Sequence, residues 1–225
     1  MDAGNPSPFH LTAADREALS QADEDFHLYA WDDLKAIIGD DISRLYSDQS
    51  QLTSVANNDL SKLTRRPSDL KRYIAWTVGI KKAYGSMTRY IYEERLNWTP
   101  LKHEEQARGG SLFAYKNPIP FEDPSDYRIL RNDWPYGMEP GLVHLVVWSK
   151  TLLPLQEDGH LTNESKARIE DFVERTFSQQ VRGTSHVDDK VLWFKNWTEL
   201  QSVRSLEHIH VIVRDVPEAL FERWT

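Results

Sequence analysis

The chain has 225 residues, of which 40% are hydrophobic and 11% aromatic, and this composition is that of a globular protein rather than a disordered one. A formal net charge of −8 argues against broad binding to nucleic acid or anionic membranes, because both depend on a net cationic surface. A small anionic ligand in a local basic pocket stays compatible with that charge.

The absence of cysteine excludes disulfides, thiolate metal sites and a cysteine nucleophile. No apolar run approaches the roughly 18 residues that cross a bilayer, and the first residues lack the basic and apolar regions of a signal peptide. We therefore expect a cytoplasmic protein that makes no membrane contact.

The first half of the chain is predicted to be helical. Thr12 is a suitable N-cap for a first helix, and 31–60 has a short helical pattern of apolar residues. Ser68 is a suitable N-cap for a longer helix over 69–83, and another helix is predicted over 87–97.

The second half is predicted to be rich in strands. Strands are expected over 127–132, 142–149, 191–196 and 207–214, with an amphipathic helix over 164–177 between the second and third. This order favours an antiparallel sheet with helices on one side, in an α+β fold.

The composition and the predicted elements divide the chain into three regions. Residues 1–8 are polar and proline-rich and are expected to be disordered, 9–107 form the helical segment, and 108–225 form the sheet region. The glycines and prolines over 99–126 mark the boundary, and we expect the helical segment to pack on the sheet as one unit. The basic pairs at 65–66, 71–72 and 81–82 are interpreted as solvated surface.

Histidines gather on one face of the predicted sheet. Side chains alternate along a strand, so His208 and His210 project from the same face, with Arg214 beside them and His144 on a neighbouring strand. A neutral imidazole can attack phosphorus or carry a proton, and a guanidinium can bind phosphate oxygens. The alternative is a structural pair with no chemistry, which is the commoner role of a His-x-His strand.

A polar and aromatic loop precedes the strand that carries His144. Asn132 and Asp133 offer directional polar groups, whereas Trp134 and Tyr136 offer stacking faces. The segment is either a ligand-binding loop or a rigid turn anchored by its two aromatic rings.

The segment 193–197 places an amide on a largely buried strand. Asn196 needs hydrogen-bond partners there, and a ligand is one candidate, whereas Lys195 alternates to the opposite face with two tryptophans. A metal site from His144, His208 and His210 is a rival hypothesis, since three imidazoles with an open position can bind zinc. No cofactor is predicted.

A set of motifs extends from about Trp31 to Trp224 and comprises 66–70, 84–86, 95–98, 132–137, 144–150, 193–197, 202–203 and 207–211. In these motifs the chain resembles the fungal N-acetylglucosamine-induced protein family, which is also classed as a domain of unknown function.

The sheet region also resembles, more weakly, the histidine-triad (HIT-like) superfamily of nucleotide hydrolases and nucleotidyl transferases. The shared order is an Asp and a Pro after a strand, a His-led apolar strand that ends in Lys150, a helix, Asn196, and Ser202 before alternating histidines. That superfamily has three alternating histidines, and the middle one attacks an α-phosphate. With His208 at the middle position, Leu206 stands where the first histidine belongs.

The resemblance implies a phosphate-handling enzyme that binds a nucleotide or nucleotide sugar. His208 is then the nucleophile or general base, and His210 and His144 position it. The residues expected to contact the ligand are Asn132, Asp133, Trp134, Tyr136, Lys150, Lys195, Asn196, Ser202 and Arg214. Leu206 favours the alternative, a non-catalytic binding or regulatory protein of the nutrient (amino-sugar) response.

Overall fold

The computed structural model describes residues 11–39, 59–102, 110–157, 159–182, 190–196, 203 and 205–225. Two predictions, the disorder of 1–8 and the ligand contact of Ser202, concern residues outside these ranges. No helix within the described ranges is long and apolar enough to span a membrane.

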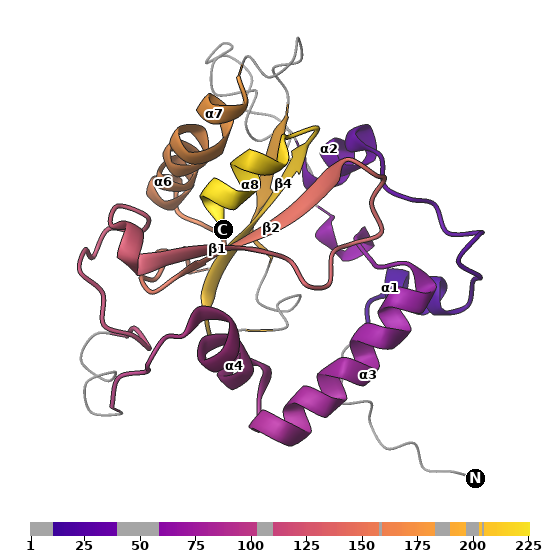
Figure 1. Cartoon of the computed structure of the whole chain (residues 1–225), viewed down its shortest axis with the longest axis horizontal. Helices are drawn as coiled ribbons and strands as arrows, with labels where there is room; N and C mark the ends of the chain where they lie inside the picture. Colours follow the sequence, from indigo (N-terminus) through magenta and orange to yellow (C-terminus); the bar gives the residue numbers. More distant parts are fainter. Residues whose placement is uncertain are drawn as a thin grey trace.

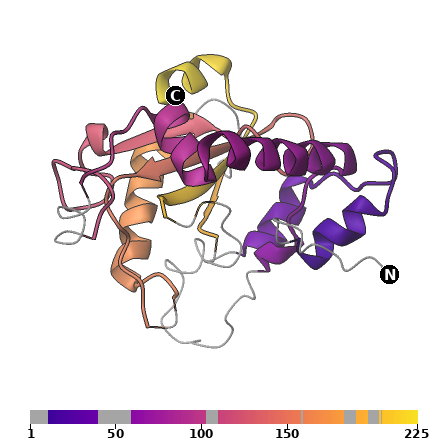
Figure 2. The same ribbon diagram turned by 90° about the horizontal axis from the view of Figure 1, so that it is seen from below.

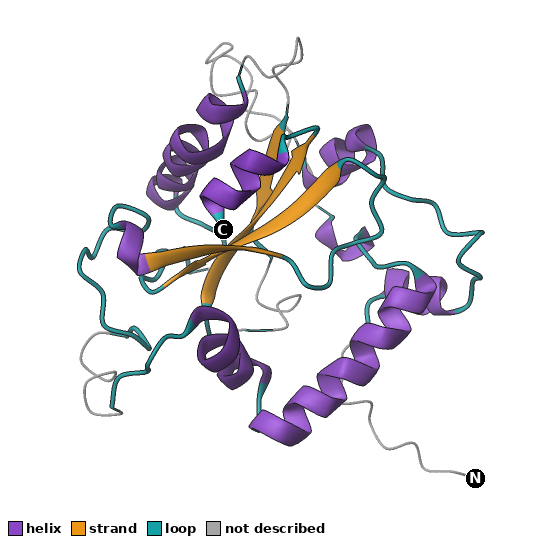
Figure 3. Cartoon of the chain, in the orientation of Figure 1, coloured by secondary structure: helices purple, strands orange, loops and turns teal. Residues whose placement is uncertain are grey.

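The chain forms an α+β fold around a four-stranded sheet with strand order β1-β2-β4-β3, in which every neighbouring pair is antiparallel (Figures 1 and 3). All four predicted strands are confirmed, although the first and third end earlier than predicted. The strands are β1 (Tyr127–Arg131), β2 (Leu142–Ser149), β3 (Val191–Phe194) and β4 (Glu207–Arg214).

One face of the sheet packs on the helices of the C-terminal half. Its inward residues include Leu145 and Val147 of β2 and Ile209 and Val211 of β4, all fully buried. In Figure 1 the helices over 163–181 lie to the upper left of the sheet, and the C-terminal helix lies in front of it. The helices are α6 (Asn163–Val173), the π-helix η4 (Glu174–Ser178), α7 (Gln179–Val181) and α8 (Glu218–Trp224).

The opposite face packs on the N-terminal helical segment, as predicted, so the helices of the strand-rich half lie on one side of the sheet and the N-terminal helices cover the other. The reason is that β2 and β4 carry large apolar residues on both faces, such as Trp148 and Ile212 on the histidine face, and both faces must be covered. The covering elements are α2 (Trp31–Ile38), η1 (Leu60–Lys62), α4 (Met87–Tyr90) and η2 (Ile91–Leu96).

The longest helix, α3 (Pro67–Tyr84), begins two residues earlier than predicted, because Pro67 occupies the first helical turn, where its missing N–H costs nothing. Ser68 instead donates its hydroxyl to Asp23. With α1 (Ala13–Leu19), α3 forms an arm of the N-terminal segment, which extends along the lower right of Figure 1 and across the molecule in Figure 2. Residues of this arm pack against the ring of Trp134.

Candidate histidine site

His144 and His210 are hydrogen-bonded to each other in the interior of the protein. His144 Nε2 lies 2.9 Å from His210 Nδ1, and the two side chains are 3% and 7% exposed. Asn132 Nδ2 lies 3.2 Å from His144 Nδ1, and the Asn196 amide lies 3.1 Å from His210 Nε2. The two imidazoles and two amides therefore form one continuous chain, which occupies all four ring nitrogens.

The direction of this chain follows from one backbone contact. The N–H of Trp134 donates to Asn132 Oδ1 at 2.9 Å, so the Asn132 amide must present its NH2 group to His144 Nδ1. A neutral His144 then carries its proton on Nε2 and donates to His210 Nδ1, and His210 carries its own proton on Nε2. The Asn196 side chain consequently has to turn its amide oxygen toward that nitrogen.

Burial keeps all three histidines neutral. Desolvation, reinforced by the positive charge of Arg65, lowers the pKa of His144 to about 3. Desolvation and the neighbouring His144 hold the pKa of His210 well below its usual value, and desolvation lowers the pKa of His208 to about 4. Near pH 7 each imidazole therefore keeps one nitrogen with a proton and one with a lone pair.

His208 differs from the other two in how its nitrogens are used. Its Nδ1 lies 2.8 Å from the backbone oxygen of Leu206, and because a carbonyl oxygen only accepts, the proton must be on Nδ1. The lone pair is then on Nε2, for which no described residue supplies a hydrogen bond. The ring is 5% exposed and packs against Trp148 and edge-on to His210.

Leu206, the residue that the predicted histidine-triad resemblance aligns with a histidine, is a core residue. Its side chain is 2% exposed and belongs to an apolar cluster with Trp148, Val146 and Ile91. The side chain at position 206 is therefore a packing residue, whereas its backbone carbonyl oxygen accepts from His208 Nδ1 and orients that ring.

The predicted loop over 132–137 is a wall of the site. Tyr136 stacks on the His144 ring with centroids 5.2 Å apart, and burial raises the pKa of its hydroxyl. Gly137 holds the loop against the N-terminal segment, because a Cβ at this position would lie 2.3 Å from the ring of Phe26. Asp133, by contrast, forms an ion pair with Arg95 at the surface.

Arg65 is a site residue that the sequence interpretation missed. Its guanidinium lies 3.9 Å from the centroid of the Tyr73 ring and 5.7 Å from that of Tyr136, and its Nε donates to the backbone oxygen of Trp134 at 3.0 Å. Arg65 was interpreted as part of a solvated turn, yet it is partly buried and its charge reaches His144 and His210. The first residue of a basic pair that precedes a proline gives no signal of this position.

Lys195 and Glu207 form an ion pair on the opposite face of the sheet from the histidines, with side chains 10% and 9% exposed. Glu207 also accepts from the backbone N–H of Leu153. The predicted alternation of Lys195 away from Asn196 is thus correct, and its ammonium group has a protein partner.

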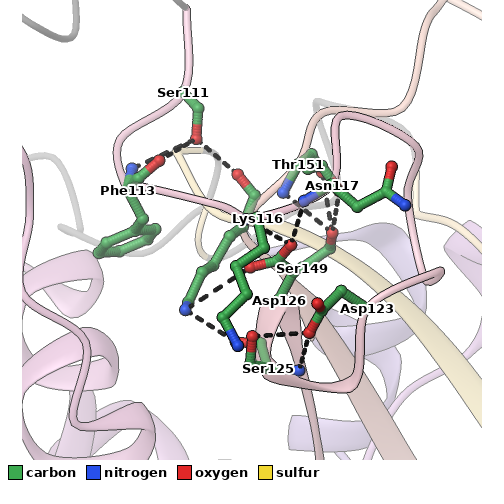
Figure 4. Close-up of polar contacts among 10 residues, drawn as sticks. Ser111, Phe113, Lys116, Asn117, Asp123, Ser125, Asp126, Ser149 and Thr151 are labelled. Atoms are coloured by element: carbon green, nitrogen blue, oxygen red, sulfur yellow. Dashed lines mark hydrogen bonds and ion pairs between the residues drawn. The ribbon is translucent and has the colours of Figure 1, made fainter.

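Two predicted ligand contacts lie away from the histidines. Lys150 donates to the backbone oxygen of Ser125 at 2.7 Å, beside the buried carboxylate of Asp126. Figure 4 shows that carboxylate among the loops around β1 and β2, where its Oδ2 accepts from the backbone N–H groups of Lys116 and Asn117. The guanidinium of Arg214 lies 4.6 Å from the centroid of the Trp31 ring, at the end of β4.

The geometry does not favour the rival metal site. His144 and His210 bond to each other through the nitrogens that would face a shared ion. Among the described residues, no three His, Asp or Glu side chains are arranged to hold a metal. The histidines are thus brought together as predicted, in a hydrogen-bonded rather than a metal-ligand arrangement.

Comparison with known proteins identifies several relatives. The chain is 31% identical over 172 residues to N-acetylglucosamine-induced protein 1 of Candida albicans, and 37% identical over 129 residues to an uncharacterized protein of Saccharomyces cerevisiae. These alignments cover 73% and 56% of this chain, but 66% and 59% of the relatives, so the chain spans less than two thirds of their length.

A solved structure supports the fold. The protein titled "Crystal Structure of HTC1" is similar with a TM-score of 0.50 and 29% identity, over 72% of this chain and 80% of that one. Residues 47–214 match the family described as "Protein of unknown function (DUF3605)". The chain belongs to this family, and the predicted resemblance to the fungal N-acetylglucosamine-induced proteins is confirmed.

Proposed function

We propose that this protein is a cytoplasmic phosphate-handling enzyme that acts on a nucleotide or nucleotide sugar, with His208 as its nucleophile or general base. The observation that carries the proposal is the contact of His208 Nδ1 with the Leu206 carbonyl oxygen, which leaves the lone pair on Nε2. A pKa of about 4 means that this lone pair is available throughout the physiological range.

In the nucleophilic form of the reaction, Nε2 donates its lone pair to phosphorus. A nitrogen–phosphorus bond forms as the bond from phosphorus to the leaving oxygen breaks, and the leaving group departs with that electron pair and takes a proton from solvent. Water then attacks the same phosphorus and loses a proton to solvent, the nitrogen–phosphorus bond breaks with its electron pair returning to Nε2, phosphate or a nucleoside monophosphate is released, and neutral His208 is regenerated.

The neighbouring groups act as a rigid support in this proposal. His144, His210 and the amides of Asn132 and Asn196 have their hydrogen bonds within the protein, so they hold the ring beside His208 in place rather than react. Asn132 and Tyr136 lie against His144, the ring of Trp134 packs on Tyr73 and Trp76 of α3, and Ser202 remains a predicted ligand contact. Lys150, Lys195 and Arg214 are left out, because each has a protein partner elsewhere.

A non-catalytic binding or regulatory protein is the second candidate. Two observations favour it. All ring nitrogens of His144 and His210 form hydrogen bonds within the protein, and Leu206 stands where the histidine-triad resemblance expects the first histidine. The name of the Candida relative, which records induction by an amino sugar, fits a role in nutrient response equally well.

Phosphorus NMR with a panel of nucleotides and nucleotide sugars tests the proposal. We expect turnover by the wild type that is lost in His208→Gln and is kept in His160→Gln, because His160 is exposed and lies outside the site. Turnover that survives in His208→Gln, or no turnover of any compound by folded wild-type protein, would leave the binding protein as the answer. The same series with a chelator separates imidazole chemistry from metal chemistry.

A further inference from the structure

Arg65 is a partly buried cation that is held in a fixed orientation. The ring of Tyr73 lies 3.9 Å from the guanidinium, the ring of Tyr136 lies near it as well, and the backbone oxygen of Trp134 accepts from Nε. Stacking between aromatic rings combined with one hydrogen bond restricts both the plane and the direction of the guanidinium. The two terminal nitrogens, Nη1 and Nη2, are therefore presented in a defined direction.

Those terminal nitrogens have no acidic partner within the described ranges. Arg65 forms no ion pair there, in contrast to its neighbour Arg66, which pairs with Asp23 at 3.3 Å. Asp15, a buried carboxylate of the same region, instead accepts from Thr64 and from the backbone N–H of Thr12. A partly buried positive charge without a carboxylate is costly, and an anionic ligand would offset that cost.

The position of Arg65 links it to the histidine site. Tyr136 contacts both the guanidinium and the His144 ring, and the positive charge of Arg65 acts on both His144 and His210. His144 and His210 are neutral, so Arg65 contributes the cationic charge on this side of the cluster. The other nearby cation, Lys195, is paired with Glu207.

We propose that Arg65 is the anion-binding residue of the site and holds a phosphate group of the ligand through Nη1 and Nη2. This inference rests on the proposed function for the identity of the ligand. The guanidinium fork matches two oxygens of a phosphate, which a lysine could not match in the same way. The N-terminal segment would thus supply the charge and the sheet the imidazole.

The spacing of the rings indicates which ligands can use both groups. The centroids of Tyr136 and His144 are 5.2 Å apart, those of His144 and His210 are 5.0 Å apart and those of His210 and His208 are 5.3 Å apart, so three ring-to-ring contacts separate Tyr136, which lies beside Arg65, from His208. A ligand that contacts both groups has to be extended. A nucleotide with more than one phosphate, or a nucleotide sugar, meets this requirement better than inorganic phosphate does.

Calorimetric titration with ADP, at low salt and on the full chain, tests this role separately from turnover. We expect Arg65→Gln to weaken ADP binding at least about tenfold, as for loss of a bidentate charged contact. Arg66→Gln is the matched control, because Arg66 is the next residue in the chain, carries the same charge and forms an exposed ion pair with Asp23. This variant should change the affinity for ADP less than about twofold. Arg65→Lys keeps the charge without the fork and should bind with intermediate affinity.

ADP binding by Arg65→Gln at wild-type affinity, or an equal loss in Arg66→Gln, would overturn the inference, as would failure of the wild type to bind ADP. If Arg65→Gln does not fold, Arg65→Lys decides, because its affinity should still fall several-fold. Arg65-dependent binding by a protein without His208-dependent turnover would reject the proposed enzyme but keep the anion site. Turnover that depends on His208 but not on Arg65 would reject this inference alone.

Discussion

His208 donates its Nδ1 proton to the backbone oxygen of Leu206, two residues earlier on the chain, at 2.8 Å. The contact is local, but its partner is fixed by the tertiary fold, since the Leu206 side chain is buried between the sheet and η2. The main chain at position 206 thereby selects the tautomer of His208 and leaves the lone pair on Nε2.

The tautomer can be measured directly. We expect nitrogen-15 NMR of the imidazoles to show His208 as the neutral form with its proton on Nδ1 at pH 7, and to show no protonation until the pH approaches about 4. A His208 signal with the proton on Nε2, or one that titrates near pH 6.5, would disprove this assignment. The signal is identified by its loss in His208→Gln.

Leu206→Ala should reduce stability without removing the orienting carbonyl. Truncation of a buried leucine leaves a cavity beside Trp148 and typically costs about 2–5 kcal/mol of unfolding free energy. Leu155→Ala is the control, because Leu155 is 43% exposed and its truncation should cost less than about 0.5 kcal/mol. Urea unfolding monitored by tryptophan fluorescence measures both, and equal midpoints for the two variants would contradict the packing role of Leu206.

Stability should fall as the pH is lowered from about 6.5 toward 4. The unfolded histidines take up protons below pH 6.5, whereas the folded ones stay neutral down to a pKa of about 4 for His208 and about 3 for His144. The unfolded state therefore binds more protons in this window, and each of these histidines lowers the free energy of unfolding by about 1.4 kcal/mol per pH unit.

Urea midpoints at pH 7.5 and pH 5 check this pH dependence. The decrease should be smaller in His144→Gln, which has one such group fewer, and unchanged in His160→Gln, where the histidine is exposed. Equal stability of the wild type at the two pH values would show that the histidines are not held neutral by folding.

Lys195→Met should be strongly destabilising, because it leaves the Glu207 carboxylate without its cation at a site where both side chains are about one tenth exposed. Loss of one partner of a buried pair typically costs about 3–5 kcal/mol. Arg168→Met removes one partner of the Arg168–Glu164 pair, which is 32% and 70% exposed, and should cost less than about 1 kcal/mol. Similar unfolding midpoints for the two variants would mean that the Lys195–Glu207 ion pair contributes little to the stability of the protein.

The elements of this fold could be predicted from sequence because their signals are local. Alternation of side chains along β4 places His208 and His210 on one face of the sheet. Alternation after β3 places the side chains of Lys195 and Asn196 on opposite faces, and the structure has both arrangements. The packing of the helical segment on the sheet is also predictable, since Trp148 and Ile212 on the histidine face need apolar partners.

Other features depend on contacts between distant segments. The position of Arg65 requires Tyr73 from α3 and Tyr136 from the loop before β2, and no sequence spacing indicates that these rings meet around one guanidinium. Similarly, the partners of Lys150 are set by the fold of the loop near Asp126, and the place of this lysine at the end of a strand does not indicate them.

Chemical modification with diethyl pyrocarbonate, mapped by peptide mass spectrometry, tests most directly whether His208 Nε2 is the reactive nitrogen. The reagent acylates unprotonated imidazole nitrogens and requires no knowledge of the substrate. We expect His208 to be modified at pH 7 in the folded protein and to be protected by ADP, with the exposed His27 and His160 as positive controls. His144 and His210, whose nitrogens are all hydrogen-bonded, should stay unmodified. A His208 that is as unreactive as these two would contradict the account and identify the cluster as structural.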